Sequence, residues 1–141
     1  MRMTPELSEQ DNDPKLYFIE QPDIVPVRDD PPLYILREDF PLLWRGRLIV
    51  VPALFMSNGA SIPRFLWSVT GFLPDGLVRA AALVHDFLYA NGGVIHVRPN
   101  FTRKEADELF HEVCIECGVP ERRALAWYYA VRIFGGRHWG A

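Results

Sequence analysis

Leu83-Val-His-Asp-Phe-Leu-Tyr89 places a histidine next to an aspartate inside a run of apolar residues. Residues 80–82 are alanines, so apolar side chains cover most of the circumference of the helix predicted here. A helix that is apolar on nearly all sides belongs at the centre of a domain. A lone carboxylate is costly to bury, so Asp86 needs a cation, hydrogen-bond donors or water in a cleft. The stretch therefore predicts a central helix that carries an ionisable site.

Three helices are predicted in the second half of the chain, and each has a recognisable start. Asp75 is a suitable N-cap for the first helix, and Pro120 suits the first turn of the third. Thr102 and Glu105 form a T-x-x-E capping box for the second. Glycines follow the end of each helix, as is typical of helix stops. The helices are expected over residues 76–90, 103–117 and 120–134.

The first half of the chain predicts short strands, because apolar runs alternate with proline, aspartate and glycine. The strongest strand covers residues 48–55, and its Pro52 predicts an edge position or a bulge. Strands followed by helices indicate an α+β fold, with a small Pro-rich antiparallel β part and a three-helix C-terminal bundle. Residues 1–14 are polar and acidic and are expected to form a flexible N-terminal arm. Residues 15–141 are then a single domain.

Composition excludes several classes of protein. The chain has 141 residues and a formal net charge of −3, which predicts no basic face for nucleic acid. No apolar stretch approaches the ~20 residues of a membrane span, and the N-terminus has no apolar signal core, so no transmembrane segment is expected. Cys114 and Cys117 form a lone C-x-x-C without the second pair of a structural zinc site, and we expect two reduced thiols.

The ionisable residues of the first two helices are predicted to meet. His85 and Tyr89 are four residues apart and share one face of the first helix. The second helix carries a polar stripe spaced by four residues, formed by Arg103, Asp107 and His111. The short connection between the helices predicts antiparallel neighbours, so Asp107 is expected to face His85 or Asp86 across a water-reachable gap.

A structural role and a chemical role both remain open for this cluster. In the structural interpretation His85 donates to a backbone carbonyl or to Asp107, and Asp86 pairs with Arg103 or Arg64 in a buried bridge that fixes the helix register. In the chemical interpretation the same residues form a reactive site, because perturbed ionisable groups gather at such sites.

The sequence Asn58-Gly59-Ala-Ser61 predicts a turn between a strand and a short helix. Ser61 precedes Ile62-Pro63 and can cap that helix. This corner is either a simple connection or one wall of the cleft. In the second case the wall of the site is formed by Asn58, Gly59, Ser61, Arg64, Arg103 and His111.

Four segments, NGASIPRFLW at 58–67, HDFLY at 85–89, RKEADELF at 103–110 and GGRHW at 135–139, together resemble a family of phage and prophage proteins, domain-of-unknown-function family 1353. The resemblance covers about residues 45–140. It implies a phage or prophage origin but assigns no activity. It also implies a location in the cytoplasm of the bacterial host or in the virion, with other virion proteins as partners.

H-D-x-x-Y at residues 85–89 also resembles the secretory, calcium-dependent phospholipases, which carry an aspartate on an antiparallel helix. The resemblance implies that His85 is the general base, that Asp86 binds calcium, and that Tyr89 and Asp107 support His85. The disulfides and the Gly-rich calcium loop of those enzymes are absent here. Residues 57–61 are the nearest replacement for that loop.

Two functions are therefore carried forward. The first is a small hydrolase with His85, Asp107 and Tyr89 as catalytic residues and a divalent cation, calcium rather than zinc, at Asp86. It would contact membranes only if phospholipid is its substrate. The second is a non-enzymatic virion component, such as a tail, connector or assembly protein. A transition-metal site is a third interpretation of the cluster, formed by His85, Asp86, Asp107 and His111.

Overall fold

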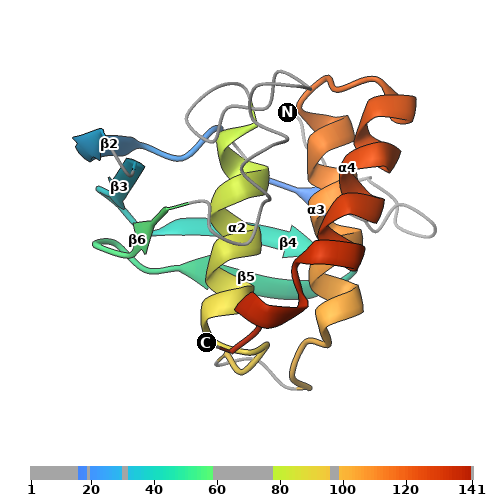
Figure 1. Cartoon of the computed structure of the whole chain (residues 1–141). Coiled ribbons are helices and arrows are strands. Elements are labelled where there is room, and N and C mark those ends of the chain that lie inside the picture. Colours follow the sequence, from blue (N-terminus) through green and yellow to red (C-terminus); the bar gives the residue numbers. More distant parts are fainter. Residues whose placement is uncertain (1–15, 19, 30–31, 59–77, 96–98, 141) are drawn as a thin grey trace, which may run out of the picture.

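The computed structural model describes residues 16–18, 20–29, 32–58, 78–95 and 99–140. Strands come first along the chain and helices follow (Figure 1). The strands are β1 Leu16–Tyr17, β2 Ile24–Asp29, β3 Pro32–Leu36, β4 Phe40–Trp44, β5 Arg47–Val51 and β6 Met56–Ser57. The helices are α2 Arg79–Ala90, α3 Arg103–Glu116 and α4 Glu121–Phe134, followed by the short 3-10 helix η1 Gly136–His138. The predicted α+β fold with a three-helix C-terminal part is confirmed.

The strands form two small antiparallel sheets, ordered β1-β4-β5 and β2-β3-β6. The strand expected over residues 48–55 is observed as β5, which ends at Val51 because Pro52 cannot continue the ladder. β5 is an edge strand, which is one of the two positions, edge or bulge, that Pro52 predicted. The sequence did not locate β2 and β4, because each contains a proline, Pro26 and Pro41, that obscures its strand pattern.

The β4–β5 hairpin supplies the sheet side of the core. Its alternate residues Phe40, Leu42 and Trp44 are buried, and Pro41 between them is exposed. This period of two is what a half-buried antiparallel sheet requires. Trp44 also donates its indole N–H to Glu112 of α3 at 2.9 Å, which fixes that helix against the sheet.

The helix starts match the sequence to different degrees. Thr102 and Glu105 form the predicted capping box at α3. Pro120 is the N-cap of α4 rather than its first residue. α2 begins at Arg79, later than expected, and the predicted cap Asp75 lies outside the described residues. A distant side chain serves α2 instead, because Gln21 accepts the backbone N–H of Ala80 at 3.0 Å.

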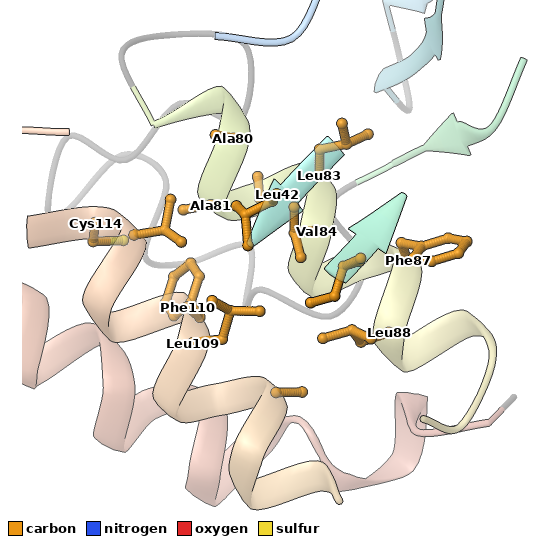
Figure 2. Close-up of a cluster of buried hydrophobic side chains, with 14 of the residues drawn as sticks. Leu42, Ala80, Ala81, Leu83, Val84, Phe87, Leu88, Leu109, Phe110 and Cys114 are labelled. Atoms are coloured by element: carbon orange, nitrogen blue, oxygen red, sulfur yellow. The ribbon is translucent and has the colours of Figure 1, made fainter. Parts of the chain in front are cut away.

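α2 and α3 pack side by side against the β4–β5 hairpin, and α4 packs on α3 (Figure 1). Figure 2 shows the resulting core, in which Leu83, Val84 and Leu88 of α2 meet Leu109 and Phe110 of α3. Ten consecutive residues of α2, from Ala80 to Tyr89, are buried, so the predicted central position of this helix is confirmed. Among the described residues, no helix is long and apolar enough to span a membrane.

Candidate functional site

A buried polar cluster lies where α2 faces α3. His85 and Tyr89 stand one turn apart on α2 and point to the same carboxylate oxygen of Asp107 on α3. Nε2 of His85 lies 2.7 Å from Oδ1 of Asp107, and the Tyr89 hydroxyl donates to that oxygen at 2.8 Å. The spacing of four residues therefore places both side chains on one face of α2, as predicted. Asp107 faces His85 rather than Asp86.

The second oxygen of Asp107 is occupied by arginines. Arg132 of α4 donates to Oδ2 at 2.8 Å, and Arg103, one turn before Asp107 on α3, places a guanidinium nitrogen 3.8 Å from it. The Asp107 side chain has 0% exposed area, so this carboxylate is compensated entirely by protein groups. Three helices thus meet at one buried negative charge.

Arg103 ties the end of α4 to the same cluster. It donates to the Tyr89 hydroxyl at 3.1 Å and to the backbone carbonyls of Val131 and Arg132 at 3.2 and 3.0 Å. These carbonyls lie in the last turn of α4, and that of Val131 also accepts the N–H of Gly135 at 2.9 Å. Gly135 follows directly, and a Cβ atom there would lie 3.0 Å from the Tyr89 hydroxyl, so only glycine fits.

The protonation states of the cluster follow from burial and hydrogen bonding. Burial alone would raise the pKa of Asp107, but hydrogen bonds from His85, Arg132 and Tyr89 outweigh it, and the pKa lies below its ordinary value. Burial raises the pKa of Tyr89 far above its ordinary value, and the charge of Asp107 adds to this. At neutral pH Asp107 is therefore ionised, Tyr89 is protonated, and Nε2 of His85 carries the hydrogen that Asp107 accepts.

The expected water-reachable gap between the helices is contradicted at His85. Its side chain, like that of Asp107, exposes 0% of its area. The imidazole lies between aromatic rings, with ring centroids 4.2 Å from Tyr89 and 4.9 Å from Phe110. Aromatic rings thus flank the histidine, and its contact with Asp107 is shielded from solvent.

Asp86 points to a different part of the molecule, as its step of about 100° around the helix requires. Its Oδ2 accepts a hydrogen bond of 2.6 Å from the hydroxyl of Ser57 on β6. Asp86 is 7% exposed. Neither carboxylate oxygen of Asp86 is bonded to Arg103, which turns to Tyr89 and α4 instead.

The predicted site wall is placed only in part. Asn58 is exposed next to Ser57, and Arg103 belongs to the cluster. His111 does not join it, because its ring packs edge-on against Tyr128 at 5.8 Å. Gly59, Ser61 and Arg64 lie outside the described residues.

The transition-metal interpretation is wrong. His85, Asp86, Asp107 and His111 are all described, and no group of three or more His, Cys, Asp or Glu in the described ranges could hold a metal ion. Cys114 and Cys117 are free thiols, as expected.

Sequence reasoning missed Arg132 and the hydrogen bond from the Ser57 hydroxyl to Asp86. Arg132 is the only charged residue in the stretch from Ala124 to Phe134, and a lone cation in an apolar run was the available signal. Ser57 lies directly before the Asn58-Gly59 turn that had been singled out. Its position on β6 became informative only once β6 was known to contact α2.

Comparison with known proteins identifies the family. Residues 35–131 match the family described as protein of unknown function DUF1353, so the chain belongs to this family. No curated protein and no solved structure matches the chain.

Proposed function

We propose that this chain is a phage or prophage hydrolase in which His85 is a general base held in place by Asp107. The phage attribution rests on the four sequence segments that resemble phage and prophage proteins. The observation that carries the hydrolase proposal is the shared contact of His85 and Tyr89 with one ionised carboxylate oxygen. A histidine oriented in this way by a carboxylate is a common base in hydrolysis.

The chemistry follows from the tautomer. Because Asp107 accepts the hydrogen on Nε2, the lone pair of the neutral imidazole lies on Nδ1. Nδ1 takes a proton from a water molecule as that water attacks an ester carbonyl. The imidazolium then gives this proton to the leaving alcohol. Asp107 stabilises the imidazolium in between, and Tyr89 and Arg132 hold Asp107. The substrate class is an ester, with phospholipid as the member that the H-D-x-x-Y resemblance favours.

Asp86 is proposed to bind a divalent cation on the side of α2 that faces β6, about 100° around the helix from the base. Calcium is favoured over zinc because the polar groups that the structure places together here are oxygens, the Asp86 carboxylate and the Ser57 hydroxyl. A bound calcium ion would supply a positive charge near the reacting carbonyl. The described residues contribute one carboxylate to such a site, so Asp86 is the residue on which the cation requirement depends.

Burial of His85 adds a requirement to the proposal. Water must reach the imidazole through an opening of the packed helices, and the free-energy cost of such an opening is highest for core segments. Chemical modification with diethyl pyrocarbonate measures this access. His85 should react more slowly than the partly exposed His138 but at a measurable rate in the folded protein. A His85 that reacts only after unfolding would contradict the enzymatic proposal.

Activity is tested with wild-type protein and His85→Gln on short-chain esters and on phospholipid vesicles, with and without added calcium. Loss of the base should lower the rate by about a hundredfold or more. Asp86→Asn should remove only the calcium dependence. His138→Gln is the matched control and should retain full activity. A wild-type protein that hydrolyses neither ester class, or a His85→Gln variant with unchanged activity, would refute the proposal.

One observation favours a second candidate, a non-enzymatic virion component such as a tail, connector or assembly protein. His85 of α2 and Arg132 of α4 both bond the fully buried carboxylate of Asp107 on α3, so one network joins the three helices. A network of this kind can serve to lock three helices together. In this case His85→Gln should reduce stability, and particles assembled without the protein should be defective. Normal particles would exclude this alternative.

A further inference from the structure

The two sheets have four edge strands, and three of them are protected against pairing with another chain. β1 and β6 are two residues long. β2 contains Pro26 and a register shift between Pro26 and Arg28. Short length, proline and bulges are the devices that natural proteins use to block sheet edges. β5 has five residues, no proline and a regular register, so it lacks all three.

The turn before β5 shows which backbone groups face outward. Residues 45 and 46 have φ of 51° and 77°, which is the two-residue type I′ turn of tight hairpins. In such a hairpin the flanking residues Trp44 and Arg47 form a hydrogen-bonded pair, and hydrogen-bonded pairs alternate along the ladder. The N–H and C=O groups of Leu48 and Val50 therefore point away from β4. In the ranges that the structure describes, neither residue makes a backbone hydrogen bond outside the sheet.

The side chains of the same two residues are exposed and apolar. Leu48 is 46% and Val50 38% exposed, and both lie on the sheet face opposite the buried Ile49. Leu43 and Pro41 of β4 stand directly opposite Leu48 and Val50, which widens the apolar surface across the hairpin. No charged side chain interrupts this surface along β5 between Arg47 and Val51.

We propose that β5 pairs with β5 of a second copy of this chain. With the twofold axis at Ile49, Leu48 of each copy lies opposite Val50 of the other. Each of these two pairs can exchange two hydrogen bonds, because both residues present outward N–H and C=O groups. The result is a continuous six-stranded antiparallel sheet with the strand order β1-β4-β5-β5-β4-β1. The exposed Leu48 and Val50 side chains then become cross-strand neighbours.

The register selects an antiparallel pairing about a twofold axis, because Leu48 and Val50 then exchange hydrogen bonds in both copies and neither copy keeps an open β5 edge. The arginines at the start of β5 do not oppose this pairing, since Arg45 and Arg47 are already ion-paired with glutamates of α3.

The test is the oligomeric state of the full chain, measured by sedimentation velocity over a range of micromolar concentrations. Wild-type protein should be a dimer. Val50→Pro removes an outward N–H that the chain's own sheet does not use, and Leu48→Lys places a charge on the edge, so both variants should be monomers. Leu125→Lys is the matched control, because it adds the same charge at a 42% exposed leucine of α4, and it should remain a dimer.

Hydrogen exchange of the Leu48 and Val50 amides separates this interface from any other. Both amides should exchange slowly in the wild-type dimer and rapidly in Leu48→Lys. A wild-type protein that is monomeric at all concentrations overturns the proposal. A dimer whose Leu48 and Val50 amides exchange rapidly also overturns it, because the contact then lies elsewhere. Protection of the edge only on adding an extended peptide would overturn it as well, because the partner is then not a second copy.

Discussion

At the scale of single residues, Asp107 decides the character of the cluster. A buried carboxylate is stable only if donors replace the water it loses, and Asp107 receives hydrogen bonds from His85, Tyr89 and Arg132. The two arginines near it come from α3 and α4, so the charge can be satisfied only when these helices are both in place. The same ionised carboxylate that stabilises the fold also orients the proposed base.

Asp107→Asn should lower the free energy of unfolding by about 3 kcal/mol at neutral pH, because Arg132 loses its partner in a buried site. Urea unfolding followed by circular dichroism measures this change. Asp23→Asn is the matched control, because Asp23 pairs with Arg37 at 3.8 Å on the surface and should contribute little. An equal effect of both substitutions would contradict the role given to Asp107.

The pH dependence of Asp107 has a defined sign. Its pKa is lower in the folded than in the unfolded protein, where it is about 3.9. Its contribution to stability is therefore fully present about one pH unit or more above the unfolded pKa, and it is lost progressively as the pH falls through the folded pKa. Unfolding measured from pH 7 down to pH 2 should show a steeper loss for wild-type protein than for Asp107→Asn. Parallel curves would contradict the lowered pKa.

Local sequence predicted part of this residue-scale picture. The spacing of His85 and Tyr89, together with the position of Asp107 on an antiparallel helix, was enough to bring the three together. Arg132 could not be placed, because its contact depends on how α4 rotates against α3. The burial of His85 also escaped prediction, since it results from tertiary contacts with Phe110 that no local pattern reports.

At the scale of elements, the helix ends show what local sequence can and cannot specify. The two residues that cap α3 belong to one stretch of four residues, and this cap was predicted. Thr102 accepts the N–H of Glu105 at 3.0 Å, and Glu105 accepts the N–H of Thr102 at 2.9 Å. The cap of α2 depends on Gln21, which is 59 residues away from Ala80 in the chain. A start that depends on so distant a residue has no local signal, and α2 accordingly begins later than expected.

Thr102→Ala tests the local cap. It should cost about 1 kcal/mol of stability, because one of the first N–H groups of α3 loses its acceptor. Lys104→Ala, an exposed substitution in the same turn, should change stability by less than about 0.5 kcal/mol. Thermal unfolding by calorimetry compares the two variants. If Lys104→Ala were as destabilising as Thr102→Ala, the capping box would not be the cause.

At the scale of the whole molecule, the order of strands and helices was predictable but the strand pairing was not. β4 pairs with β1 and β5, and β3 pairs with β2 and β6, so two of these four pairings join strands that are not consecutive in the chain. The sequence pattern defines which face of a strand is apolar but not which partner it selects. The helices are held against the sheet by contacts between residues far apart in the sequence. One example is the hydrogen bond from Trp44 to Glu112, which are 68 residues apart.

The C-terminal turn, formed by η1 with Trp139 and Gly140, packs against Tyr89 of the polar cluster. Trp139 meets the ring of Tyr89 edge-on at 5.1 Å, and the N–H of Gly140 donates to the Tyr89 carbonyl at 2.7 Å. Trp139→Ala should therefore lower stability by about 1–3 kcal/mol, less than for a fully buried tryptophan because Trp139 is only partly buried.

Phe134→Ala is the matched control for this substitution, because Phe134 is also aromatic but 52% exposed, and it should cost less than about 0.5 kcal/mol. Both variants can be compared by urea unfolding followed by far-ultraviolet circular dichroism. If Trp139→Ala proved as mild as Phe134→Ala, the C-terminal turn would not stabilise the cluster, and the network around Asp107 would hold the three helices without it.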